Sequence, residues 1–195
     1  MKGRLTGLAW VTLLGFPLIG WIILYFFRDD PLQIMLRSSS SIPIQLVIGV
    51  GSGTLLGLGA RWLITRPFLN DVGIKYARII QNFGISGVGI WFVSFCAGFG
   101  EELLFRGAIQ PLAGIWVTAI VFVAIHGYLD PRDWKISAYG LFMTLAIVAL
   151  GYLTEHFGIW AAATAHMMID VVLFYYLTRL KIQPHTIYEV DSHEV

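Results

Sequence analysis

Six apolar segments, separated by short polar stretches, account for most of this sequence. A helix needs roughly 20 apolar residues to cross the hydrocarbon core of a bilayer. Most of the segments approach or exceed this length, and the fourth is the shortest. They predict an all-α, polytopic transmembrane helix bundle of about six spans, at 5–27, 42–64, 85–110, 115–128, 136–153 and 157–180.

The composition agrees with a chain that has lipid as its solvent. Hydrophobic residues make up 57% of the sequence and charged residues 13%, whereas soluble domains carry about 45–50% and about 25%. The net charge of +1 provides no basic field for nucleic acid, so we expect no nucleic-acid partner. The single cysteine, Cys96, excludes an intramolecular disulfide.

The remaining segments complete this outline. The stretch 65–83 mixes charged with apolar residues, which predicts an amphipathic helix lying at the membrane interface. The sequence 111–114, Pro-Leu-Ala-Gly, predicts a turn. The first apolar run exceeds the roughly 7–15 residues of a signal-peptide core, so we expect it to be retained. We expect one integral-membrane domain over 1–195, with a flexible tail at 181–195.

Basic residues predict the orientation of this bundle. With the N-terminus inside, ten lysines and arginines fall on the cytoplasmic side and only Arg28 and Arg37 on the other. Cytoplasmic loops carry such an excess in membrane proteins. We therefore expect both termini in the cytoplasm. The small size and the six spans favour a prokaryotic inner membrane.

A few ionisable residues interrupt the apolar spans, where each costs several kcal/mol and usually serves a function. They are Glu101, Glu102, Arg106, His126, His166 and Asp170. Residues four apart share a helix face, so Glu102 can pair with Arg106, and His166 with Asp170. Glu101 points about 100° away from Glu102 and is left for another role.

These residue types suit hydrolysis. A carboxylate beside a histidine, such as Glu101 with His126, can activate water as a general base. A second histidine, His166, can stabilise a developing oxyanion together with Asp170. The alternative is a divalent metal such as zinc, held by Glu101, His126 and His166. Because the zinc-protease motif H-E-x-x-H is absent, we expect no cofactor.

Three motifs in this order resemble a known family. The sequence Glu-Glu-Leu-Leu-Phe-Arg at 101–106 resembles the E-E-x-x-x-R motif of the CAAX protease and bacteriocin-processing (CPBP, or Abi) family. The sequence from Phe122 to His126 is similar to its F-x-x-x-H motif, and that from His166 to Asp170 to its H-x-x-x-N/D motif. Each motif alone is weak evidence, but the ordered set within a polytopic chain is specific.

The resemblance implies an α-helical intramembrane endopeptidase with a catalytic core at about 85–180. By this similarity, Glu101 and His126 activate the water, and His166 and Asp170 form the oxyanion site. The family's glutamate-dependent mechanism is favoured over a metal-dependent one. The implied partners are the lipid bilayer and a membrane-associated or lipidated polypeptide, cleaved near a C-terminal prenylated or sorting tail.

Asp170 departs from the prenyl-protease branch, which has asparagine at this position. An ionised aspartate repels an oxyanion, so Asp170 has either to stay protonated or to orient His166. The departure favours a bacterial subgroup. The resemblance also implies that Glu102 and Arg106 support and orient the site.

Two other functions remain open at this stage. Glutamate and histidine chains also move protons across membranes, which allows a proton-coupled transporter or relay. A non-enzymatic membrane protein of the bacteriocin-immunity type is the second. The relay needs a polar path to both faces, and the immunity protein would be expected to have decayed motifs.

Overall fold

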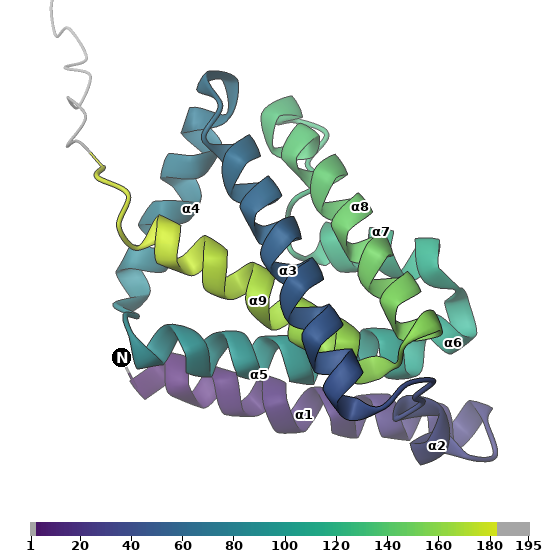
Figure 1. The fold of residues 1–195 in the computed structure, drawn as a ribbon. Coiled ribbons are helices and arrows are strands. Elements are labelled where there is room, and N and C mark those ends of the chain that lie inside the picture. The colour runs from purple at the N-terminus through teal and green to yellow at the C-terminus, as the bar shows by residue number, and fades with distance from the viewer. Residues whose placement is uncertain (1–2, 183–195) are drawn as a thin grey trace, which may run out of the picture.

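The computed structural model describes residues 3–182 of the 195-residue chain, and this part is almost entirely helical (Figure 1). The elements are α1 (Gly3–Phe27), α2 (Pro31–Met35), α3 (Ile42–Ile64), η1 (Pro67–Leu69), α4 (Asn70–Phe83), α5 (Val88–Leu104), η2 (Phe105–Ile109), α6 (Gln110–Ala113), α7 (Ile115–Ile125), α8 (Trp134–His156) and α9 (Ile159–Leu177). The all-α prediction is confirmed. The predicted flexible tail falls largely at 183–195, outside the described residues.

Five helices are long and apolar enough to cross a membrane: α1, α3, the continuous helix Val88–Ala113, α8 and α9. The sixth predicted span corresponds to α7, which has 11 residues and is apolar but short. At 1.5 Å per residue, α7 is about 16 Å long, roughly half of the hydrocarbon thickness. It needs the non-helical residues that follow it to complete a passage.

Contacts between segments show that α7 and the residues after it run from one end of the bundle to the other. At one end of the bundle, Arg28 donates to the Pro111 carbonyl at 3.2 Å, and Ser38 forms an isolated antiparallel bridge with Gly158. Arg28 lies before α2, Pro111 after η2, Ser38 before α3 and Gly158 before α9. They are the loops that an alternating six-pass path places on one side.

The loops of the opposite side meet at the other end. Lys135, at the start of α8, donates to Asp71 of α4 at 2.6 Å. The Gln81 amide of α4 donates to the carbonyl of Leu177, at the end of α9, at 2.8 Å. The chain therefore enters α7 at one end of the bundle and leaves the following loop at the other. About six passes describe the fold.

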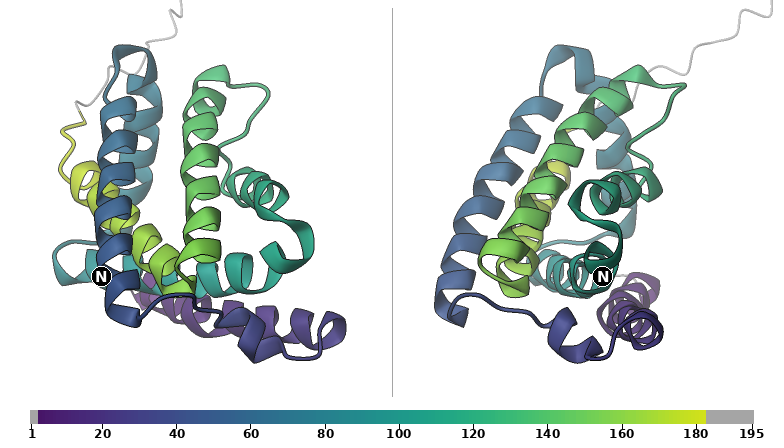
Figure 2. Two further views of the ribbon diagram at one scale, coloured as in Figure 1. Left: turned by 45° about the vertical axis from the view of Figure 1, so that its right-hand side comes forward. Right: turned by 90° about the vertical axis from the view of Figure 1, so that its right-hand side faces the viewer.

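Helix α9 is the centre of the arrangement. It packs against α3 on one side and α5 on the other, and α1 lies along α5. In the views of Figures 1 and 2, α1 and α5 run side by side along one edge, while α3 and α8 rise steeply from it. This layout leaves α4 to pack across the far end of α9.

A glycine row allows α3 to approach α9 closely. A Cβ atom added at Gly49 would lie 2.7 Å from the Cβ of Thr164, and one at Gly53 would lie 2.6 Å from the Cα of Ala165. Such spacings exclude any side chain there. Small residues at every fourth position are typical of close helix contacts in membranes. The glycine-rich second span is thus used within the chain.

The turn predicted at 111–114 is wrong in its position. After α5 the helix widens into the π-helical segment η2 and continues as α6 to Ala113. Pro111 lies inside this continuous helix, directly after the wider π-helical turns that accommodate its ring and its missing N–H. The chain turns only at Gly114, whose φ of +79° suits glycine.

Helix α4 is amphipathic, as the sequence predicts for 65–83. Val72 and Ala77 are buried against the bundle, while Lys75 and Arg78 are exposed. The Lys135 ammonium beside Asp71 lowers the pKa of that carboxyl. The helix itself begins at Asn70, because Pro67 starts a separate 3-10 turn before it.

Candidate functional site

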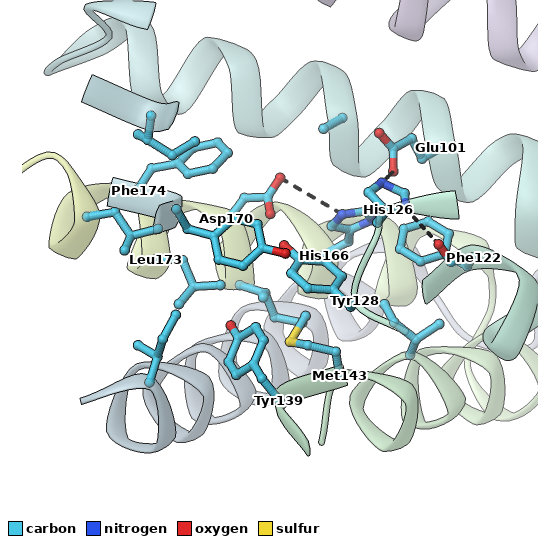
Figure 3. Close-up of a pocket in the computed structure, with 17 residues that line it drawn as sticks. Glu101, Phe122, His126, Tyr128, Tyr139, Met143, His166, Asp170, Leu173 and Phe174 are labelled. Carbon is cyan, nitrogen blue, oxygen red and sulfur yellow. Dashed lines mark hydrogen bonds and ion pairs between the residues drawn. The ribbon is translucent and has the colours of Figure 1, made fainter. Parts of the chain in front are cut away.

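A cavity of about 220 Å³ lies inside the bundle and collects residues from α3, α4, α5, α7, α8 and α9. The four residues predicted to be catalytic, Glu101, His126, His166 and Asp170, all line it (Figure 3). They come from α5, from the C-cap of α7 and from α9. The structure therefore brings the predicted set together, while their catalytic roles stay a prediction.

Glu101 and His126 face each other across one wall of the cavity. The Nε2 atom of His126 lies 3.4 Å from Oε2 of Glu101. The other ring nitrogen, Nδ1, lies 2.7 Å from the carbonyl oxygen of Phe122. Because a carbonyl oxygen only accepts, Nδ1 carries the proton. In a neutral imidazole, Nε2 is then an acceptor that faces a second acceptor, Glu101.

The end of α7 produces this orientation of His126. The helix ends at Ile125, and His126 is the residue that caps it. Its backbone N–H donates to the Phe122 carbonyl at 3.3 Å, and its ring bonds the same oxygen. Gly127 follows with a φ of +76°, which turns the chain back into the cavity.

Glu102 is completely buried and binds two cationic or polar partners at once. Its Oε1 atom lies 2.9 Å from Nη1 of Arg106 and 2.8 Å from Nδ1 of His166. Arg106 also donates to the carbonyl of Ile147 at 3.3 Å. The predicted Glu102–Arg106 pair is present, and it extends to a residue on another helix.

The pairing of His166 differs from the sequence-based expectation. Its Nε2 atom lies 3.9 Å from Oδ2 of Asp170, too far for a direct hydrogen bond. Its close partner is Glu102, not Asp170. Residue spacing along a helix reveals partners on the same helix only, so the Glu102–His166 contact between α5 and α9 was missed.

Phe122 is the packing centre of this site. Its ring stacks on His126 with centroids 4.3 Å apart and meets the His166 ring edge-on at 5.6 Å. The Arg106 guanidinium lies 4.8 Å from the same ring. One aromatic side chain thus fixes the relative positions of both histidines and of the buried arginine.

Tyrosines form the wall opposite Glu101, and no sequence motif indicated them. Figure 3 shows Tyr128 and Tyr139 pointing into the cavity beneath His166 and Asp170. The Tyr128 ring lies 5.2 Å from Tyr76 and 5.6 Å from Tyr139. Within residues 3–182, none of the three hydroxyls has a protein hydrogen-bond partner. Burial raises the pKa of Tyr76 to about 12, so this phenol keeps its proton at neutral pH.

The rest of the cavity is apolar and runs toward α4. Its lining there comes from the ends of α3 and α9 and from α4 and α8, through Ile64, Ile80, Met143, Leu173, Phe174 and Leu177. A polar group of residues therefore stands at one end of an apolar pocket. Such a pocket suits a substrate with an apolar portion beside its reacting bond.

The alternative metal ligands do not fit a metal ion in this arrangement. Among residues 3–182, no group of three His, Cys, Asp or Glu side chains is placed to hold one. No chemical step is therefore assigned to a metal.

Comparison with known proteins agrees with the motifs. Residues 84–172 match the family described as type II CAAX prenyl endopeptidase Rce1-like. The chain is also 34% identical over 85 residues to the uncharacterized protein YpbD of Bacillus subtilis (strain 168). That similarity covers 43% of this chain and 42% of the relative's length. No solved structure matches the chain significantly.

The matched region contains all residues of the three motifs, and with them the ionisable residues at the cavity: Glu101, Glu102, Arg106, His126, His166 and Asp170. The helices of the structure include five that are apolar and long enough to span a membrane. The resemblance to the CPBP family is thus confirmed by the Rce1-like match over residues 84–172, and the chain is an integral membrane protein.

Proposed function

We propose that this protein is an intramembrane endopeptidase that hydrolyses a peptide bond with a water activated by Glu101 and His126. The observation that carries the proposal is the 3.4 Å distance between Glu101 Oε2 and His126 Nε2 at the cavity wall. With a neutral His126 both atoms are acceptors, and a water molecule on the cavity side of the pair can donate one O–H to each. Both then polarise it for attack.

In the proposed reaction Glu101 first accepts a proton from water and later donates it to the leaving group. The water oxygen forms a bond to the carbonyl carbon while Glu101 takes the water proton, and the carbonyl oxygen becomes an oxyanion. When the C–N bond breaks, Glu101 returns that proton to the leaving nitrogen. Burial of the site in an apolar bundle makes each electrostatic contact stronger than in water.

His166 is the proposed donor to the oxyanion. Its Nδ1–H is held by Glu102, whose own charge is balanced by Arg106. A doubly protonated ring therefore points its remaining N–H, on Nε2, toward the cavity and Asp170. Preorganised donors of this kind contribute about 10²–10³ in rate.

Asp170 occupies the position of an asparagine in the prenyl-protease branch and cannot donate while ionised. Tyr128 offers an unpartnered hydroxyl in the same cavity. We assign Tyr128 as the second oxyanion donor, with Asp170 holding a positive charge on His166. Figure 3 shows Tyr128 on the same side of His166 as the cavity interior.

The proposed substrate is a membrane-associated polypeptide that carries a lipid or apolar tail. The family description names a prenyl endopeptidase, and the apolar part of the cavity, toward Leu173 and Phe174, can take an apolar chain. The cavity runs toward α4, at the end of the bundle that we expect on the cytoplasmic side. In this orientation the proposed substrate presents its C-terminal tail from the cytoplasm.

The relay alternative is weakened by Arg106. Polar residues do continue from Glu102 through Arg106 to Gln110, which donates to Glu155 at 2.7 Å near the opposite surface. A guanidinium keeps its protons at any physiological pH. It also makes no hydrogen bond to Gln110 within the described residues. The row therefore cannot pass protons from one face to the other.

Cleavage of a synthetic farnesylated peptide by the purified protein in detergent tests the proposal. Wild type is expected to cleave it, and Glu101→Gln to be inactive while keeping the thermal stability of wild type. Activity is expected to survive dialysis against a chelator. Activity lost with chelation and restored by zinc would replace the glutamate mechanism with a metal one.

A further inference from the structure

A second concave surface lies on the opposite side of α9 from the cavity. This groove, of about 620 Å³, is formed by the end of α3, the start of α5 and the last turns of α9. Its apolar wall includes Leu58, Trp91 and Val172. Leu58 and Trp91 are 45% and 43% exposed, which is expected of side chains that face lipid.

Three cations border the groove: Arg61, Arg179 and Lys181. No carboxylate stands among the described residues that line it. Within residues 3–182, none of the three cations forms an ion pair or donates a hydrogen bond to the protein. Among the described residues, three cations without an acidic partner therefore meet in this one groove.

Aromatic rings hold two of these cations in place. The Arg61 guanidinium lies 5.3 Å from the Tyr176 ring, and that of Arg179 lies 4.8 Å from the Tyr175 ring. A cation over an aromatic ring retains its charge and its free N–H donors. The two arginines are thus positioned, yet their hydrogen-bonding capacity is unused.

The position along the bundle matches a lipid. Arg61 stands in the last turn of α3, and Arg179 directly follows α9. Both are at the end of the bundle that carries most of the basic residues, where headgroups meet the apolar core. The apolar wall extends from there into the spans. Basic sites between transmembrane helices are suited to anionic headgroups.

We propose that this groove binds an anionic phospholipid of the bilayer, with its phosphate against Arg61 and Arg179 and its acyl chains along Leu58, Trp91 and Val172. Bound lipid would support α9 from the face opposite the cavity. The two faces are distinct, because Leu173, Phe174 and Leu177 line the cavity while Val172 and Tyr176 line the groove. The inference does not depend on the proposed protease activity.

The test uses the full chain in a mild nonionic detergent, with phosphatidylglycerol or phosphatidylcholine of identical acyl chains. Native mass spectrometry is expected to show retained phosphatidylglycerol, and this lipid alone is expected to raise the melting temperature. Near a membrane surface each basic residue strengthens anion binding about fivefold. Arg61→Gln with Arg179→Gln is therefore expected to weaken binding roughly 25-fold.

Arg66→Gln is the matched control, because Arg66 also lies over an aromatic ring, 4.4 Å from Trp62, but outside the groove. It is expected to bind phosphatidylglycerol like wild type. Equal effects of both lipids, or equal losses in Arg66→Gln and in the double variant, would overturn the proposal. So would an equal rise in melting temperature with inorganic phosphate, which would indicate a site for free anions.

Discussion

Nδ1 of His166 lies 2.8 Å from Oε1 of Glu102, although the residues are 64 positions apart in the chain. This hydrogen bond joins α5 to α9 at the candidate site. Gly98, one turn before Glu102, makes it possible, because an added Cβ would lie 2.7 Å from the Ala163 carbonyl oxygen. Helix packing and the polar cluster are therefore parts of one arrangement.

Replacing Arg106 by Ala is expected to destabilise the protein by about 3–5 kcal/mol, because it leaves the buried Glu102 charge without its cation. His166 remains as a partner but cannot supply the same fixed charge. Thermal unfolding in detergent measures the effect, with Arg78→Ala as the exposed control. A loss as small as that of the control would contradict the role of the pair.

Removing both charges gives a sharper version of this test. The double variant Glu102→Gln with Arg106→Met is expected to be more stable than Arg106→Ala, because no isolated charge stays buried. It is also expected to impair catalysis by releasing His166. A double variant less stable than Arg106→Ala would contradict the cost assigned to the unpaired Glu102 charge.

The glycine row on α3 predicts a contrast between neighbouring positions. At Gly53 an added Cβ would lie 2.6 Å from the Ala165 Cα, whereas at Gly51 nothing lies within 4 Å. Gly53→Ala is expected to cost about 1–3 kcal/mol by forcing α3 from α9. Gly51→Ala is expected to be neutral or stabilising by up to about 1 kcal/mol, since alanine favours helix. Similar melting temperatures for the two variants would rule out the close contact.

Tyr128→Phe tests the assignment of the second oxyanion donor. Loss of one donor is expected to lower kcat by about 10²-fold with little change in KM, because the contact forms mainly in the transition state. Tyr152→Phe, an exposed position on α8, is the control. An unchanged kcat in Tyr128→Phe would remove this residue from the mechanism.

The six-pass path predicts opposite exposure of two loops. Asp30→Cys is expected to react with a membrane-impermeant maleimide in intact cells, and Lys75→Cys only after the cells are opened. Cys96 is completely buried and is not expected to react with the maleimide. Labelling of both positions from outside would contradict the alternation, and a reversed pattern would invert the predicted orientation.

Much of this architecture follows from the sequence because it depends on local properties. Apolar length predicts the spans, and spacing along one helix predicts the pair of Glu102 and Arg106. The turn expected at Pro111 was wrong, because the π-helical segment before it lets the helix continue. A widened helical turn depends on tertiary packing and leaves no simple pattern in the sequence.

Contacts between helices could not be predicted in the same way. The register of α5 against α9, which joins Glu102 to His166, depends on how deeply small residues let the helices approach. Tyr128 belongs to none of the three motifs, and Gly127, whose φ is positive, directly precedes it where it enters the cavity. A glycine directly after the histidine of the second motif is the one sequence signal that could have indicated this turn.

Mass spectrometry of membrane-protein termini can detect peptide hydrolysis that depends on Glu101. Cells that produce the intact protein are compared with cells that produce Glu101→Gln at the same level. At least one new C-terminus, next to an apolar or lipidated tail, is expected only with the intact protein. Identical sets of termini in the two cell populations would contradict the proposal that Glu101 activates water for peptide hydrolysis.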